Sequence, residues 1–270
     1  MIENKDLTCV KLRTDKYSAR IYLNRPEVHN ALNDILINEL YDIFAELKKE
    51  KDLRVVILTS EGKSFCAGAD LNWMKSVVNN SYEQNMLESL KLADLMNIIY
   101  TFPTPVIARV NGSAIGGGVG LMSVCDIIIA DKKATFGLSE VSLGLVPSVI
   151  SPYVINRIGE TYAREVFVTG QRMSATEAAE RGLINMAVET EDLDKFVDEK
   201  IKYIMKNGPE AVRIVKEMIQ KVRLIEPGET REYTATLIAD LRGSKEAQEG
   251  MTAFLEKRRP SWVKDMNSES

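Results

Sequence analysis

Three segments of the 270-residue chain contain residue types that could do chemistry: 64–71 (SFCAGADL), 111–120 (NGSAIGGGVG) and 136–148 (FGLSEVSLGLVPS). The middle segment contains the successive glycines Gly116, Gly117 and Gly118, which leave backbone N–H groups uncovered because they have no side chains. Where a strand passes through such glycines into a helix, the N–H groups can bind an anion. The alternative interpretation is a tight turn packed closely against a neighbouring strand.

Two nucleotide-binding motifs can be tested against this glycine segment. The Walker pattern requires Gly-Lys followed by Ser or Thr, five residues after its first glycine, but Gly112 is followed at that spacing by Gly117 and Gly118. The dinucleotide fingerprint requires GxGxxG, whereas Gly116, Gly118 and Gly120 form GxGxG. The segment matches neither motif.

The other candidate site residues are AGAD at 67–70 and Glu140. AGAD follows the apolar run 54–60, so it is expected where a buried strand ends, a common place for ligand contacts in α/β sheets. A plain turn would explain the same residues. Glu140 is a carboxylate within an otherwise apolar or small run, where burial would raise its pKa toward the range useful in acid–base catalysis. A solvated or ion-paired glutamate is the alternative.

The elements that must position these segments alternate between strands and helices. Residues 8–13 and 19–24 predict a strand hairpin, and the apolar positions between Asn33 and Leu47 recur at helical spacing. Strands buried on both faces are predicted from continuous apolar runs at 54–60, 105–110 and 126–130. A helix over 82–100 separates the first two of these runs. This alternation favours parallel pairing through right-handed crossovers and therefore an α/β fold.

The pattern changes in the last third of the chain. Ser174 and Glu177 predict a capping box. Residues 192–257 lack a good strand pattern and are expected to be helical, with breaks at 207–209, 227–228 and Gly243. We therefore expect an α/β core over 1–191 and a helical region over 192–270, whose apolar positions would be buried against partner subunits.

Composition and charge exclude several classes of protein. A net charge of −4, with no cluster of Lys and Arg, disfavours nucleic-acid binding. The widely spaced Cys9, Cys66 and Cys125 and the single His29 provide no disulfide framework, zinc site or histidine-based triad, so no metal is expected. The most apolar stretch, 110–125, is too short and too rich in glycine to cross a membrane. Because no signal segment is recognised at the amino terminus, a cytoplasmic location is expected.

Together with NRPEVHNAL at 24–32 and FLEKRRPSW at 254–262, the three segments resemble the crotonase superfamily of enoyl-CoA hydratases and isomerases over essentially the whole chain. Residues 136–154, with GGGVGL, more narrowly resemble the bacterial methylglutaconyl-CoA hydratases of leucine and isoprenoid-acid breakdown. The resemblance implies a crotonase-like spiral of strand-strand-helix turns and a helical carboxy-terminal trimerisation region. It also implies a homotrimer or dimer of trimers, and an acyl-CoA substrate that brings its own coenzyme A, with no separate cofactor.

The resemblance assigns roles to individual residues. The backbone N–H groups of Ala69 and Gly117 would form an oxyanion hole for the thioester carbonyl, and Glu140 would be the catalytic carboxylate. The further residues implied in binding coenzyme A are Val28, Ala67, Asp70, Leu71, Asn72 and Lys257. Lys257 would reach a phosphate of coenzyme A, and His29 would be structural or lie beside the channel.

One position departs from the family pattern. Hydratases with two catalytic glutamates have one of them where this chain has Gly120, so only Glu140 is carried over. An oxyanion hole with a single acid can still stabilise an enolate and move the proton at the alpha carbon. Activation of water would then fall to Glu140, to a carboxylate of the substrate, or to a hydroxyl such as Ser148 or Ser151.

The sequence therefore leaves three functions open. The first is hydration of a branched 2-enoyl-CoA, such as methylglutaconyl-CoA, to the 3-hydroxyacyl-CoA. The second is an enoyl-CoA delta-isomerase with Glu140 as the sole proton shuttle. The third is a non-catalytic binding or scaffold protein of the same fold, which the retained Glu140 and both oxyanion-hole segments disfavour.

Overall fold

The computed structural model describes residues 2–263, and the chain divides into two compact units. The first unit extends to Phe102, resumes at Val106 and ends at Val197. The second comprises Pro103–Pro105 and the described chain from Asp198 onward. The boundary falls inside helix α7 (Leu193–Lys206), so one helix contributes to both units.

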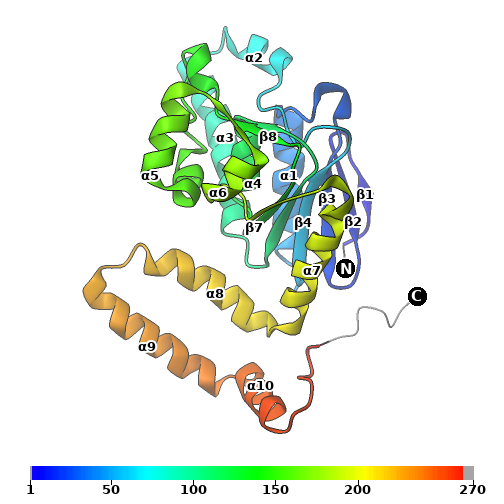
Figure 1. Ribbon diagram of the computed structural model, residues 1–270, viewed down its shortest axis with the longest axis vertical. Helices are drawn as coiled ribbons and strands as arrows, with labels where there is room; N and C mark the ends of the chain where they lie inside the picture. The colour runs from blue at the N-terminus through cyan, green and yellow to red at the C-terminus, as the bar shows by residue number, and fades with distance from the viewer. Residues whose placement is uncertain (1, 264–270) are drawn as a thin grey trace. The chain divides into compact units, whose positions relative to one another are not determined.

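A seven-stranded sheet forms the centre of the first unit (Figure 1). Its strands, in spatial order, are β1 (Lys5–Asp6), β2 (Val10–Thr14), β3 (Ser18–Leu23), β4 (Val55–Ser60), β5 (Val106–Val110), β7 (Ile127–Asp131) and β10 (Met186–Val188). The pairs β1·β2 and β2·β3 are antiparallel, which confirms the predicted hairpin. The pairs from β3 to β10 are parallel, as the alternation of strands and helices predicted.

Helices cover this sheet because its central strands are apolar on both faces. Every residue of β4 is buried. Helix α1 (Asp34–Leu47) begins where the Asn33 side chain accepts the Leu36 N–H at 2.9 Å, and α3 (Tyr82–Tyr100) occupies its predicted range. Phe44 of α1 and Phe102 meet edge to face with ring centroids 5.2 Å apart, a favourable aromatic geometry in the core.

A second, three-stranded sheet was not predicted from the sequence. It consists of β6 (Ala114–Ile115), β8 (Thr135–Gly137) and β9 (Arg172–Ser174), in that order. Helix α4 (Gly117–Ser123) contacts β6, and α6 (Ala175–Glu180) contacts β8 and β9. Helix α5 (Ser151–Thr169) packs against α4 and the 3-10 turn η2 (Glu140–Leu143). The capping box of Ser174 and Glu177 is confirmed at the start of α6. Because β6 and β8 are parallel, this small sheet brings the segments that follow them to the same edge.

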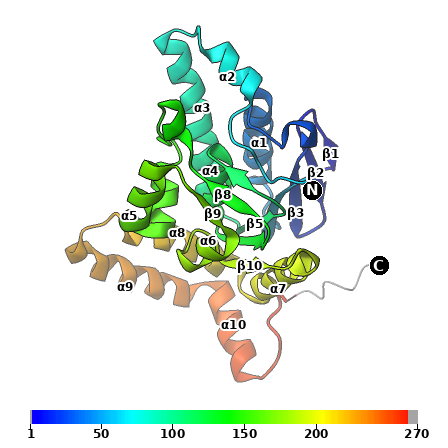
Figure 2. The same ribbon diagram turned by 45° about the horizontal axis from the view of Figure 1, so that its top comes forward.

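The second unit is helical, as the sequence predicted. It contains the end of α7, then α8 (Pro209–Val222), α9 (Pro227–Gly243) and α10 (Lys245–Leu255), and Figure 2 shows α10 leaving α9 at an angle. The expected break at 227–228 is wrong in position: Pro227 is the first residue of α9, because the first turn of a helix needs no N–H from that residue. None of the residues of α8 or α9, all of which the structure describes, is buried.

Candidate active site

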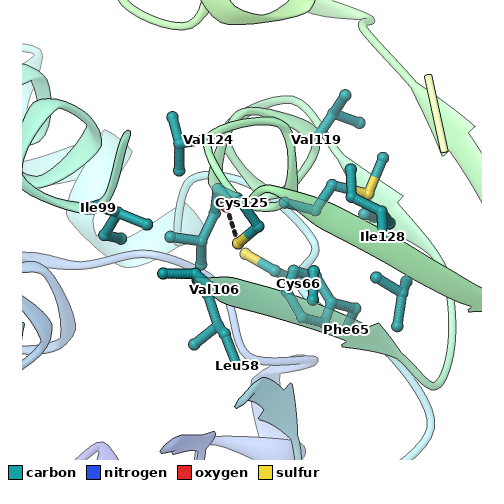
Figure 3. Close-up of a cluster of buried hydrophobic side chains, with 14 of the residues drawn as sticks. Leu58, Phe65, Cys66, Ile99, Val106, Val119, Val124, Cys125 and Ile128 are labelled. Carbon is teal, nitrogen blue, oxygen red and sulfur yellow. Dashed lines mark hydrogen bonds between the residues drawn. The ribbon is translucent and has the colours of Figure 1, made fainter. Parts of the chain in front are cut away.

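Segment 64–70 is held against segment 113–115 by backbone hydrogen bonds. The N–H of Phe65 donates to the carbonyl of Ser113 at 3.0 Å, and the N–H of Ile115 donates to the carbonyl of Cys66 at 3.0 Å. Phe65 and Cys66 are fully buried, and Figure 3 shows them with Val119 in one cluster of apolar side chains. The core therefore fixes both glycine-containing segments relative to each other.

A second set of backbone bonds orients Ala69. The N–H of Leu32 donates to the carbonyl of Gly68 at 2.7 Å, and the N–H of Asp70 donates to the carbonyl of Leu32 at 2.8 Å. Since these bonds flank Ala69 in a parallel bridge, its own N–H and carbonyl point away from Leu32. Within residues 2–263 the Ala69 N–H donates to no protein acceptor, and Ala69 is exposed.

Gly117 supplies a second unpaired N–H beside the first. As the first residue of α4 it has no acceptor within the helix, and it has none elsewhere in the described chain. A Cβ atom placed on Gly68, the residue before Ala69, would lie 3.8 Å from the Gly117 nitrogen and 2.9 Å from the Ile115 carbonyl oxygen. The two unpaired donors therefore belong to adjacent stretches of backbone that touch only because residue 68 is glycine.

Glu140 lies against the same glycines. The N–H of Gly116 donates to the carbonyl of Gly137 at 2.7 Å, which brings the end of β8 to the start of α4. A Cβ atom on Gly116 would lie 3.0 Å from Oε1 of Glu140, and Gly116 has φ +51°, a conformation that glycine adopts without strain. Glycine at 116 thus leaves room for the carboxylate.

The carboxyl group of Glu140 is desolvated and incompletely paired. Its Oε2 atom is buried and has no hydrogen-bond partner in the described part of the chain. Burial raises the pKa of Glu140 above its usual value, against a smaller opposing effect of a backbone hydrogen bond. A carboxyl group with a raised pKa exchanges protons more readily near neutral pH, as a general acid or base must.

The other residues implied in binding coenzyme A differ in how far they are buried. Val28 is half-buried at the end of η1 (Pro26–Val28), whereas Ala67, Leu71 and Asn72 are exposed. Asp70 is buried. Lys257 belongs to the second unit, so its approach to a phosphate of coenzyme A stays a prediction.

Asp70 has a structural task that the sequence did not reveal. Its carboxylate accepts the N–H groups of Asn72 and Trp73, which caps α2 (Leu71–Val77), and pairs with the Arg25 guanidinium at 2.8 Å. Burial disfavours the charged form, but the hydrogen bonds from Arg25 and the backbone outweigh it and lower the pKa of Asp70. Arg25 lies 45 residues away in the chain, and no local pattern marks the pair.

The hydroxyl groups considered for water activation and the single histidine lie at defined places. The Ser151 hydroxyl donates to the carbonyl of Ser148 at 2.8 Å, and Ser148 is exposed. His29 has φ +53° and its Nδ1 lies 3.0 Å from the hydroxyl oxygen of Ser64. His29 thus joins the Val28 turn to the segment that begins at Ser64, which fits the structural alternative proposed for it.

Comparison with known proteins assigns the chain to a family. The family model described as enoyl-CoA hydratase/isomerase matches residues 15–265. The chain belongs to the enoyl-CoA hydratase/isomerase family, within the crotonase superfamily. A short-chain-enoyl-CoA hydratase of Clostridium acetobutylicum is 33% identical over 260 residues, which cover 94% of this chain and 97% of that protein.

Solved structures of the enoyl-CoA hydratase/isomerase family share the fold. An enoyl-CoA hydratase from Shewanella pealeana has a TM-score of 0.91 and 36% identity, over 95% of this chain and 96% of that one. Pseudomonas aeruginosa AtuE has a TM-score of 0.92 and 30% identity, over 95% of this chain and all of that one (100%). The mixed α/β, crotonase-like fold with a helical carboxy-terminal region is therefore confirmed.

The described residues of this chain were also compared with what a metal site and a membrane-spanning helix require. Its described side chains include no group of three or more His, Cys, Asp or Glu residues that could hold a metal ion. Within residues 2–263, none of its helices combines the length and apolar character required to cross a bilayer.

Proposed function

We propose that this member of the family hydrates a 2-enoyl-CoA thioester reversibly to the 3-hydroxyacyl-CoA. One observation supports the proposal. Two unpaired backbone N–H groups, at Ala69 and Gly117, occur together with the buried Oε2 of Glu140, which has no partner among the described residues. Two donors and an acid are the parts needed to stabilise an enolate and to move its proton.

In the proposed reaction the thioester oxygen accepts the N–H groups of Ala69 and Gly117. Negative charge that develops on this oxygen is stabilised by donors already in place, each worth about 100-fold or more in rate. Glu140 takes a proton from the attacking water, whose oxygen bonds to the beta carbon, and a proton is delivered from Glu140 to the alpha carbon. All atoms of the water then appear in the product, and the carboxylate is regenerated.

We infer a branched acyl group, with methylglutaconyl-CoA as the named candidate. The exposed apolar side chains on the chain segments that adjoin the site support this choice. Leu71 follows the Ala69 segment, and Leu143, Leu145 and Val146 follow Glu140, all of them exposed. Apolar surface of this kind favours an aliphatic acyl chain near the reacting carbons, and the branch itself rests on the resemblance of residues 136–154 alone.

The experiment that tests hydration uses solvent oxygen. Wild-type protein with a branched 2-enoyl-CoA in oxygen-18 water is expected to yield a labelled 3-hydroxyacyl-CoA, and Glu140→Gln is expected to lower that rate by about two to four powers of ten. Conversion of 3-enoyl-CoA to 2-enoyl-CoA, with no label entering product from any acyl chain, would establish the delta-isomerase instead. Binding of acyl-CoA with neither reaction would establish a binding protein.

We also propose that the chain assembles as a homotrimer or a dimer of trimers. The helices of the second unit support this, because α8 and α9 contain no buried residue. Large apolar side chains are exposed there, among them Ile219, Leu224, Ile238 and Phe254. Large apolar side chains exposed in this number are expected to be covered by another subunit.

We propose a cytoplasmic enzyme that needs no cofactor beyond the coenzyme A of its substrate. Cys9, Cys66 and Cys125 are buried, and none of them forms a disulfide within the described residues, a state that a reducing compartment preserves. The acid, the donors and the water of the proposed reaction are all supplied without a metal.

A further inference from the structure

Gly120 and Ile150 compete for one volume beside the candidate site. Gly120 is buried in the second turn of α4, and a Cβ atom built on it would lie 2.1 Å from Cγ2 and 2.7 Å from Cβ of Ile150. Real Cβ contacts are not this short, and rotation about χ1 cannot move the Ile150 Cβ atom. Ile150 precedes α5 and is 3% exposed, so the core around it leaves little freedom.

This shared volume adjoins the Glu140 carboxylate along α4. Gly120 lies one helical turn after Gly116, to whose carbonyl its N–H donates at 3.2 Å. Gly116 is the N-cap of α4 and is not helical, with φ +51° and ψ −119°. Oε1 of Glu140 approaches Gly116, and Ile150 approaches Gly120 one turn further along. A side chain at 120 would therefore lie about one helical turn from the Glu140 carboxylate, in the volume that Ile150 fills.

The Ile150 side chain has neither a proton to transfer nor a hydrogen bond to donate. Its methyl groups keep the α4 face apolar at this point, which agrees with the absence, among the described residues, of any partner for Oε2 of Glu140. A second carboxylate on this face would have to displace Ile150.

We propose that Ile150 determines how many carboxylates the site holds: by filling the space over Gly120 it limits the site to the single carboxylate of Glu140. This inference rests on the proposed function for its chemical part, since it describes how that site handles a 2-enoyl-CoA. Its steric part rests on the two distances to Ile150 alone.

The steric part is tested by thermal unfolding without substrate. Gly120→Ala is expected to lower the Tm sharply. Adding Ile150→Ala should restore little of the lost Tm, because the Ile150 Cβ atom at 2.7 Å remains. Adding Ile150→Gly removes that atom, so the double variant should have a Tm at least as high as that of Ile150→Gly alone. Val149→Gly, at the neighbouring half-buried position, is the matched control and should not rescue. An unchanged Tm for Gly120→Ala, or strict additivity with Ile150→Gly, would overturn the proposal.

The chemical part is tested with crotonyl-CoA as the probe. Gly120→Glu alone is expected to unfold or to fall in Tm, and Gly120→Glu with Ile150→Gly is expected to fold. The pH–rate profile of that double variant should show two ionisations where Ile150→Gly shows one, because adjacent carboxylates titrate as a coupled pair. A folded double variant with an unchanged profile would overturn the role of Ile150 in setting the number of carboxylates.

These outcomes are distinguishable from failure of the proposed function. If wild-type protein hydrates no 2-enoyl-CoA, the hydratase proposal and the chemical part of the Ile150 inference are both wrong. The Tm series still decides the steric part. If wild-type protein is active and the Tm series is additive, only the Ile150 inference fails.

Discussion

Replacing Glu140 by Gln is expected to make the protein more stable while it lowers the rate of hydration by about two to four powers of ten. The cause is the burial that raises the pKa of Glu140 and leaves its Oε2 without a partner. Gln has nearly the same shape and no charge to desolvate. Gln still has a polar group here, so the gain comes only from removing the desolvated charge, and because this side chain is only half-buried we expect about 1 kcal/mol near neutral pH.

The pH dependence of this gain has a definite sign. A carboxyl group whose pKa is higher in the folded than in the unfolded state binds protons more tightly when folded. Its contribution to the free energy of unfolding therefore falls as the pH rises above the unfolded value of about 4.3, and levels off above the folded pKa. Gln does not titrate, so the advantage of Glu140→Gln should be smallest near pH 4 and reach its plateau above the folded pKa of Glu140.

The assay is differential scanning fluorimetry of both proteins at equal concentration from pH 4 to pH 8. A gain of about 1 kcal/mol corresponds to about 2 °C in Tm for a chain of this size. Glu160→Gln is the control, because Glu160 forms an exposed ion pair with Arg164 on α5 and such pairs contribute about 0–1 kcal/mol. A Tm difference for Glu140→Gln that is negative, or that does not grow with pH, would refute the desolvation argument.

The remaining predictions concern the oxyanion hole, a buried ion pair, the thiols and assembly. Gly117→Val should lower turnover by about 100-fold or more, and its circular dichroism must be checked because a Cβ atom there would lie 2.7 Å from Cδ1 of Leu32; unchanged turnover in a folded variant would remove Gly117 from the mechanism. Asp70→Asn should cost about 3 kcal/mol in chemical denaturation by leaving the Arg25 charge without its carboxylate partner. Because the pKa of Asp70 is lowered, the wild-type advantage should begin to decline as the pH falls below the unfolded value of about 3.9 and be lost below the folded pKa. Thiol titration of the denatured, unreduced protein should find all three cysteines free, and a count of one would contradict the cytoplasmic proposal. Light scattering at micromolar concentration should give a multiple of 30.3 kDa, and a monomer would defeat the assembly proposal.

The sequence predicted the elements that strong local patterns specify. The apolar stripe of α1, the whole of α3 and the capping box of Ser174 and Glu177 follow from side-chain spacing and hydrogen-bonding capacity within a few residues. The strands β6, β8 and β9 are only two or three residues long. Such strands contain too few residues for an alternating pattern, so the smaller sheet could not be predicted.

The sequence likewise predicted the residue types of the candidate site but not the contacts that bring them together. Glu140 and the glycines of 116–118 were visible as residue types, but their proximity depends on the bond from Gly116 to Gly137 and on Cys66 pairing with Ile115. Those contacts join residues far apart in the chain. Ile150 gave no sequence signal because an isoleucine among apolar neighbours is an ordinary core residue, and only the distance to Gly120 distinguishes it.

The packing of α4 also limits how new acyl specificities could be obtained by directed evolution. A Cβ atom at Gly118 would lie 2.3 Å from the carbonyl oxygen of Cys66, and Gly144, which has open space around it, has φ +70° and should also stay glycine. Libraries that randomise 116–120 would therefore consist mostly of unfolded protein. Diversity placed at Leu143, Leu145 and Val146, which are exposed, would leave the core intact and sample the surface next to Glu140.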